Sequence, residues 1–273
     1  MLDADRSLCI VGCGTMGEAI VGGLLRAGWL EPQQICATTR RPERAQRLRD
    51  KLGIAADTDN VAAMRDAQVV ILCLKPQRFA KMLDQATVAS ALEGKLVISI
   101  AAGITLDQLE GWLPKSKVVR AMPNTPALIG SGMTVLARAD EVDDDEIALA
   151  RRIFESVGSV LELENKHMDA VTSLNGSGPA FAYVMLEAMA DGGVMMGLPR
   201  EAALTIASHV FSGAAAMVSE TDLHPAALKD QVTTPAGCTI AGLLMMEDGR
   251  IRSVIARTIQ EAARVAGGLG HEK

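Results

Sequence analysis

Leu8-Cys9-Ile10-Val11-Gly12-Cys13-Gly14-Thr15-Met16-Gly17 is the stretch that decides the fold. Its four apolar residues predict a buried strand, and the spacing G-x-G-x-x-G follows directly, ahead of a helical run. In such a strand–turn–helix unit Gly12 permits the tight turn, Gly14 lets the backbone approach a pyrophosphate, and Gly17 allows close helix packing. Because the free N–H groups at a helix start also favour anions, we expect a dinucleotide here. The alternative is a Gly-rich turn that binds no ligand.

Outward from this unit, β-branched runs alternate with helical runs through the first half of the chain. We expect strands at residues 8–11, 35–38, 69–74, 96–100, 118–122, 132–136 and 159–163. We expect helices at residues 16–27, 42–52, 61–64, 76–89, 105–112 and 143–156. The alternation predicts an α/β fold with a Rossmann-type, doubly wound parallel sheet covered on both faces, which we assign to residues 1–165.

Beyond about Asn165 the strand pattern stops, and an all-helical domain is expected over residues 166–273. Its helices are predicted at residues 179–196, 200–219, 225–232, 235–247 and 250–266. The first of these is apolar nearly all round, and a domain of this size has too little interior to bury it. We therefore expect a partner subunit to cover it, in a homodimer or a higher oligomer built from dimers.

Composition narrows the class of protein. A net charge of −6 over 273 residues argues against nucleic acid, which needs clustered Lys and Arg. Five scattered cysteines show neither a disulfide framework nor zinc spacing, so we expect reduced thiols, no metal and a cytoplasmic location. Residues 1–7 lack the pattern of a secretory signal, and the apolar stretches at 180–196 and 202–219 are interrupted by charged or polar residues. No membrane span is expected.

The second predicted strand ends in Thr38-Thr39-Arg40-Arg41. An NAD site usually has Asp or Glu about twenty residues past the Gly-rich turn, to bind the ribose hydroxyls. Hydroxyls followed by guanidinium groups suit a 2′-phosphate instead, so we expect NADPH, with NADH as a possible second cofactor. The alternative is that Arg40 and Arg41 are solvated turn residues ahead of a helix at Pro42.

Two further turns follow predicted strands, Leu74-Lys75-Pro76 and Met122-Pro123-Asn124-Thr125-Pro126. Ligands of open α/β sheets bind at the carboxyl ends of strands, where these turns lie. Lys75 and Asn124 offer donors toward the cofactor, and Asn60 is placed to meet its adenosine half. Each of these residues could equally be a surface cap.

The segment Thr234-Pro235-Ala236-Gly237-Cys238-Thr239 predicts a site for a small anion. Thr234 suits an N-cap and Pro235 the first helical position, while small residues leave the first-turn N–H groups open to a carboxylate. The alternative is an ordinary capped helix. The segment at residues 175–180 has the same construction and predicts either a ligand contact or tight helix packing.

Nothing in the second half looks like a helix-borne Lys or a His–Asp pair positioned for general acid–base chemistry; His167, His209, His224 and His271 fit caps, core or surface. A reaction that needs little proton transfer, such as hydride addition to a C=N bond, fits this absence.

Together these segments resemble pyrroline-5-carboxylate reductase over essentially the whole chain. The most specific part is residues 230–243, and residues 12–17, 74–76, 122–126 and 176–179 match in order. The resemblance implies a Rossmann domain, a helical domain that interlocks with a second subunit, and NAD(P)H-dependent reduction of 1-pyrroline-5-carboxylate to L-proline.

The resemblance also implies roles for individual residues. The substrate would be held by Asp222, Thr234, Gly237, Cys238 and Thr239, with the Thr239 hydroxyl as the catalytic partner of the imine nitrogen. The cofactor would be bound by Gly12, Gly14, Thr15, Met16, Gly17, Thr39, Arg40, Asn60, Leu74, Lys75, Pro76 and Asn124.

Three positions depart from the family pattern. Thr234 stands where Ser is frequent, Ala236 where a second Gly is common, and Asp222 where a longer acid can lie. A reductase of a hydroxy acid or another imine is the nearest alternative, although a hydroxy-acid enzyme would want a Lys or His near Gly178. A catalytically silent NADPH-binding sensor or scaffold is the other.

Overall fold

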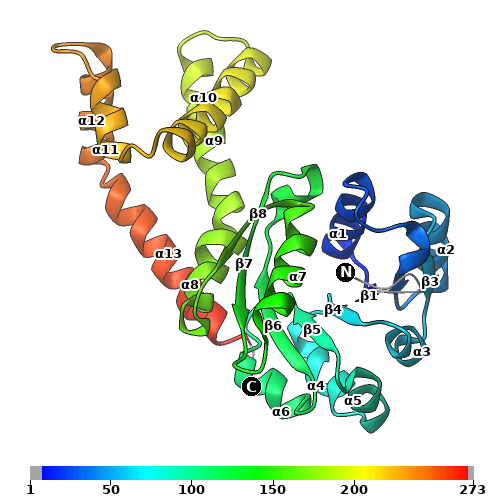
Figure 1. Ribbon diagram of the computed structural model, residues 1–273. Coiled ribbons are helices and arrows are strands. Elements are labelled where there is room, and N and C mark those ends of the chain that lie inside the picture. Colours follow the sequence, from blue (N-terminus) through cyan, green and yellow to red (C-terminus); the bar gives the residue numbers. More distant parts are fainter. Residues whose placement is uncertain (1–7, 270–273) are drawn as a thin grey trace. The chain divides into compact units, whose positions relative to one another are not determined.

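A computed structural model describes residues 8–269 and divides into two compact units (Figure 1). The second unit is Gly178–Gln260, and the first contains the described residues on either side of it. The division falls later than residue 165 because the short helices that follow that residue pack against the sheet. The expectations made for residues 1–7 and for His271 lie outside the described residues.

The first unit is built on an eight-stranded sheet of order β3-β2-β1-β4-β5-β6-β7-β8. Its strands are β1 Leu8–Val11, β2 Ile35–Thr38, β3 Ala55–Asp57, β4 Val69–Leu72, β5 Leu96–Ser99, β6 Lys117–Met122, β7 Gly132–Arg138 and β8 Gly158–Glu162. Neighbouring strands are parallel except β6 and β7, which are antiparallel. The predominantly parallel sheet confirms the expected fold class, and β6–β7 differs because only the short 3-10 turn η3 (Thr125–Ile129) joins the two strands, whereas a parallel return needs a longer crossover.

Helices cover both faces of this sheet, since every residue of β1, β2, β4 and β5 is buried. Helix α1 packs against α7, and α3 packs against α5. The helical elements of this part are α1 Thr15–Arg26, η1 Pro32–Gln34, α2 Pro42–Leu52, α3 Asn60–Arg65, η2 Pro76–Arg78, α4 Phe79–Leu83, α5 Ala86–Leu92, α6 Leu106–Trp112, α7 Asp144–Glu155, η4 Asn165–His167, α8 Met168–Val171 and the π-helical turn η5 Thr172–Ser177.

The strand order places β1 between β2 and β4. After β1 the chain adds β2 and β3 on one side of that strand, and from β4 onward it adds strands on the other side. The direction in which strands are added therefore reverses between β1 and β4. In open α/β sheets this switch point leaves a crevice beyond the carboxyl ends of the two strands. The fold thereby brings the Gly-rich turn after β1 and the segment that follows β4 to the same edge.

The second unit is all-helical. It contains α9 Gly178–Met195, α10 Arg200–Thr221, α11 Pro225–Val232, α12 Cys238–Asp248 and the first residues of α13 Ile251–Gly267. Helix α9 begins at Gly178, one residue before the start expected at Pro179, and it follows α8 and η5 without a break. The π-helical turn η5 ends at Ser177, two residues before Pro179, whose ring removes a backbone N–H donor.

Small residues hold α9 against α10, with Ala190, Ala203 and Ala207 as the buried cluster. Large apolar side chains of this unit stay exposed in the single chain, and Met195 and Met196 are 79% and 84% exposed. Helix α10 is the one helix among residues 8–269 whose length and composition would let it cross a membrane, with a mean hydropathy of 1.4. An unburied apolar surface of this extent marks an interaction face.

Candidate functional site

The Gly-rich turn after β1 is held by the end of β2. The Gly12 N–H donates to Thr38 Oγ1 at 3.2 Å, and the Cys13 N–H donates to the Thr38 carbonyl at 2.7 Å. Gly12 has a φ of +76°, and a Cβ there would lie 2.5 Å from Leu74 Cδ2. Both the backbone conformation and the space therefore require glycine at this position.

The next two glycines of the motif differ in what surrounds them. A Cβ on Gly17 would lie 2.9 Å from Ile10 Cγ2, so α1 approaches β1 closely there. A Cβ on Gly14 would meet only the Gly12 carbonyl at 3.8 Å, which leaves this face open. Gly14 is also the N-cap of α1, and no side chain of residues 8–269 caps that end, so the first-turn N–H groups, including those of Thr15 and Met16, have no side-chain partner among these residues. This open, uncapped helix start suits a pyrophosphate.

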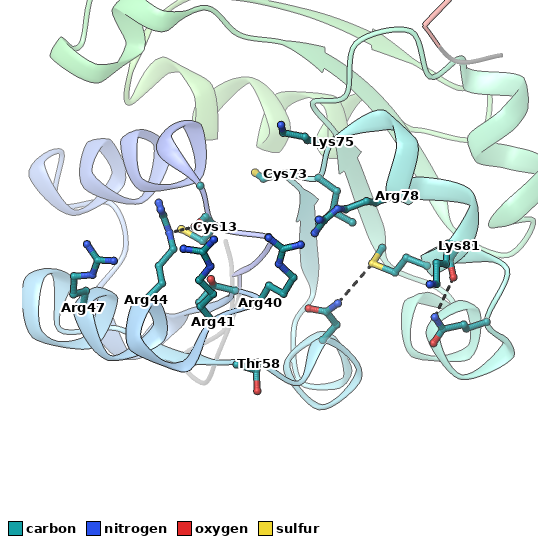
Figure 2. A pocket seen from close by; sticks show the side chains of 17 residues that line it. Cys13, Arg40, Arg41, Arg44, Arg47, Thr58, Cys73, Lys75, Arg78 and Lys81 are labelled. Atoms are coloured by element: carbon teal, nitrogen blue, oxygen red, sulfur yellow. Dashed lines mark hydrogen bonds between the residues drawn. The ribbon is translucent and has the colours of Figure 1, made fainter. Parts of the chain in front are cut away.

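A cavity of about 960 Å³ is formed by the segments that follow β1, β2, β3 and β4 (Figure 2). Seven of the cofactor positions expected from sequence line it: Gly12, Gly14, Thr39, Arg40, Asn60, Leu74 and Lys75. Thr15, Met16, Gly17, Pro76 and Asn124 do not line it. The structure therefore brings together most of the expected cofactor residues, all on one edge of the sheet.

The cavity wall is strongly basic. Arg40, Arg41, Arg44, Arg47, Lys75, Arg78 and Lys81 line it, and no Asp or Glu of residues 8–269 is among the lining residues. The Arg44 side chain is engaged, since it pairs with Glu18 at 2.5 Å and donates to the Cys13 carbonyl at 3.0 Å. Within residues 8–269 the other six side chains have neither an ion pair nor a hydrogen bond. Such a concentration of unpaired positive charge favours a ligand with several negative charges.

Sequence reasoning missed four of these basic residues. Arg44 and Arg47 lie on α2 at the helical spacing that continues from Arg40, and Arg78 and Lys81 follow Lys75 at steps of three. That spacing, which places charges on one face of a helical segment, was the available signal.

Asn124 is occupied by contacts within the protein. Its Nδ2 donates to Asn175 Oδ1 at 2.9 Å, and its Oδ1 accepts from the Met133 N–H at 2.9 Å. Asn175 Nδ2 in turn donates to the carbonyls of Met122 and Met133. This network joins the ends of β6 and β7 to η5 and leaves Asn124 one amide hydrogen for another partner.

Two cysteines belong to the apolar part of the cavity wall. Burial raises the pKa of the Cys13 thiol to about 12, and burial raises the pKa of Cys73 well above its usual range. Both side chains line the cavity as neutral thiols. They therefore supply an apolar surface and no nucleophile near neutral pH.

The chain makes a tight turn just before α12. The Gly237 N–H donates to the Thr234 carbonyl at 3.1 Å, and Ala236 has a φ of +56°. Proline at the second position and a positive φ at the third are typical of a type II turn. Helix α12 begins at Cys238 with Gly237 as its N-cap, so the Thr234 cap and the helix start at Pro235 were wrong. A residue with a positive φ cannot continue a right-handed helix.

This turn still presents the donors expected for a carboxylate. No described side chain caps α12, so the first-turn N–H groups, which include those of Cys238 and Thr239, lack a side-chain partner within the described part of the chain. A Cβ on Gly237 would collide with the Thr234 hydroxyl, so glycine is needed for this approach. Cys238 is exposed and Thr239 is half-buried.

Asp222 lies apart from these donors in the chain. It ends α10 in the left-handed conformation, with a φ of +55°, and is exposed. Among the described residues no hydrogen bond or ion pair joins it to the turn before α12. Among residues 8–269 no group of three His, Cys, Asp or Glu side chains is placed to hold a metal. The His224 side chain caps α11 through its Nδ1.

Comparison with known proteins covers both units. Residues 165–269 match the family model described as pyrroline-5-carboxylate reductase dimerisation, and residues 7–103 match the one described as NADP oxidoreductase coenzyme F420-dependent. A pyrroline-5-carboxylate reductase from Synechocystis is 40% identical over 263 residues, which are 96% of this chain and 98% of that protein. One from Arabidopsis thaliana is 37% identical over 93% of this chain and 92% of the relative.

Solved structures give the same picture. A pyrroline-5-carboxylate reductase from Coxiella burnetii superposes with a TM-score of 0.90 at 31% identity, covering 98% of this chain and 100% of its own. The Plasmodium falciparum pyrroline carboxylate reductase with NADP bound superposes with a TM-score of 0.88 at 26% identity, covering 97% and 98%.

Proposed function

The chain belongs to the pyrroline-5-carboxylate reductase family, and from this premise we propose how its residues bind the cofactor and the substrate. The enzyme reduces 1-pyrroline-5-carboxylate to L-proline, the last step of proline biosynthesis, by hydride transfer from a nicotinamide dinucleotide to the ring C=N bond. The hydride ends on the ring carbon and the electron pair of the C=N bond on the nitrogen.

For the cofactor we propose NADPH in preference to NADH. The observation that carries this proposal is the cavity wall, to which the described residues contribute seven cations and no carboxylate. Bound NADPH supplies the hydride. Gly14 and the N–H groups of Thr15 and Met16 would hold the pyrophosphate, since this helix start is open and uncapped. Thr39 and Arg40 would hold the 2′-phosphate.

The remaining cofactor contacts come from neighbouring turns. Asn60 and Lys75 would hydrogen-bond along the cofactor, while Leu74 and Pro76 shape the wall after β4. Gly12 and Gly17 act through the backbone turn and the packing of α1. Asn124 would donate its one remaining amide hydrogen to the cofactor. Its other hydrogen bonds link the end of β6 to the start of β7 and to η5.

For the substrate we propose the turn before α12. The first-turn N–H groups, with Cys238 and Thr239 among them, and the Thr234 hydroxyl would bind the carboxylate, and Gly237 keeps the approach open. The Thr239 hydroxyl would accept a hydrogen bond from the protonated ring nitrogen and so orient the C=N bond. A protonated imine is already electrophilic, so orientation is the main contribution needed from the protein. Asp222 would also bind the substrate, near this turn.

The test of the substrate site is a pair of variants at one position. Thr239→Val removes the hydroxyl at nearly constant shape and should lower kcat about ten- to a hundredfold, which corresponds to a charge-assisted hydrogen bond. Thr239→Ser keeps the hydroxyl and should retain most of the activity. NADPH binding, followed by its fluorescence, should stay within twofold in both. Full activity of Thr239→Val would refute the role of this hydroxyl.

We further propose a homodimer, or a higher oligomer of dimers, formed through residues 166–273, with residues 1–165 as the cofactor domain. The exposed apolar side chains of α9 and α10 support it, since a second subunit would cover them. We place the enzyme in the cytoplasm, with a small imino acid as its ligand and neither nucleic acid nor membrane as a partner. Light scattering should give at least twice the chain mass of 28.8 kDa without detergent; a monomer would refute the assembly.

A further inference from the structure

Two guanidinium groups face each other across the cofactor cavity. Arg40 follows β2, whereas Arg78 is the last residue of η2, beyond β4. Both line the cavity, and Figure 2 shows the Arg78 side chain pointing toward Arg40. In the described part of the chain neither side chain has an ion pair or a hydrogen bond. The two sides of the switch point therefore direct unpaired charges of the same sign at a shared space.

An anion between the two groups would relieve their mutual repulsion. Like charges repel, and within residues 8–269 the cavity lining offers no carboxylate to compensate them. A guanidinium group presents parallel N–H donors that match two oxygens of a phosphate. A phosphate monoester between the two would receive such donors from opposite directions and would be neutralised on both sides.

We propose that Arg78 is a specificity-determining residue that binds the 2′-phosphate of NADPH opposite Arg40. The inference rests on the proposed function, because it takes NADPH as the ligand of this cavity. It deepens that proposal, since cofactor preference then depends on the segment after β4 as well as on the end of β2. Arg78 touches the adenosine half of the cofactor and takes no part in the chemical step.

The experiment compares two nucleotide fragments that differ only in the 2′-phosphate. Binding of 2′,5′-ADP and of 5′-ADP is measured by titration calorimetry on the full-length wild type, Arg78→Met and Arg65→Met. Arg65 is the matched control because it is an arginine on α3 of the same unit, does not line the cavity and has no ion pair among the described residues. Both positions are exposed, and melting curves check that the variants fold.

We expect Arg78→Met to weaken 2′,5′-ADP about tenfold while 5′-ADP changes less than twofold. Arg65→Met should change the affinity for both fragments less than twofold. In kinetics with 1-pyrroline-5-carboxylate, Arg78→Met should raise the KM for NADPH and leave kcat and the KM for NADH in place.

Three results would overturn the inference. Unchanged binding of 2′,5′-ADP by Arg78→Met would mean that Arg78 is a solvated surface residue. Equal weakening of both fragments would mean that it binds the pyrophosphate instead. Equal affinity of the wild type for the two fragments would overturn the NADPH proposal itself, and this outcome is recognised without any variant.

Discussion

Replacing Gly17 by Ala should destabilise the first unit, whereas the same change at Gly22, one turn further along α1, should stabilise it. A Cβ on Gly17 would lie 2.9 Å from Ile10 Cγ2 and 3.1 Å from Cys13 Sγ. Ile10 is fully buried in β1, an interior strand of the sheet, so it has little room to move. A Cβ on Gly22 would meet only the flexible end of Arg26, at 3.2 Å from Nη1.

The expected magnitudes follow from these contacts. Removing glycine from a helix interior stabilises it by about 0.5–1 kcal/mol, and Gly22→Ala should gain roughly this amount. Gly17→Ala gains the same but adds an overpacking penalty of about 1–3 kcal/mol, because Ile10 and Cys13 must shift. The two variants should therefore differ by about 1–3 kcal/mol. At roughly 2–4 °C per kcal/mol, melting temperatures should differ by several degrees.

The assay can be confined to the first unit. The chain has two tryptophans, Trp29 and Trp112, and both pack against the core of that unit. Tryptophan fluorescence during urea unfolding therefore follows this unit, at matched protein concentrations that keep the oligomer constant. If Gly17→Ala is as stable as Gly22→Ala, α1 does not approach β1 as closely as described.

Three further perturbations test other parts of the structure. Burial raises the pKa of Cys13 from about 9 to about 12, so the folded state keeps the thiol neutral where the unfolded state ionises. The free energy of unfolding is therefore unaffected by this thiol below pH 9 and falls as the pH rises from 9 toward 12. The free energy of unfolding of the wild type should fall by about 1.4 kcal/mol per pH unit more steeply than that of Cys13→Ala over this window, and parallel curves would contradict it. Ala236→Gly should remove the strain of the positive φ in the turn before α12, which costs about 1–2 kcal/mol with alanine. Glycine also makes the unfolded chain more flexible, which costs up to about 1 kcal/mol, so the variant should be neutral to mildly stabilised in thermal melts. A clear loss of stability would rule out this turn geometry. Arg40→Asp should repel the 2′-phosphate and lower kcat/KM for NADPH at least tenfold while sparing NADH, and an unaltered NADPH preference would remove Arg40 from the site.

The first β-α-β unit was predictable because its signals are local. The observed bounds of β1 and β2, Leu8–Val11 and Ile35–Thr38, are those expected from the apolar runs. Strand β3, Ala55–Asp57, was missed because three residues carry too little pattern and the strand forms by pairing with β2. The helix expected at residues 76–89 is broken into η2, α4 and α5, since Gln85 is extended between the last two.

The substrate turn shows why local preference can mislead. Proline after threonine is a common helix start, yet here it occupies the second position of a turn whose third residue, Ala236, has a positive φ. Alanine has no local preference for that conformation, so only the folded backbone reveals it. The basic wall of the cofactor cavity depends in the same way on the fold, because only the order of the strands brings Arg40 and Arg78 to one cavity.

The most direct test of the account measures both halves of the central claim together. Purified protein is mixed with 1-pyrroline-5-carboxylate and either NADPH or NADH, and nucleotide oxidation and proline formation are recorded in the same samples. We expect one proline for each NADPH oxidised, with a kcat/KM for NADPH at least tenfold above that for NADH. Equal use of the two cofactors would contradict the role of the basic cavity, and nucleotide oxidation without proline would contradict the reaction.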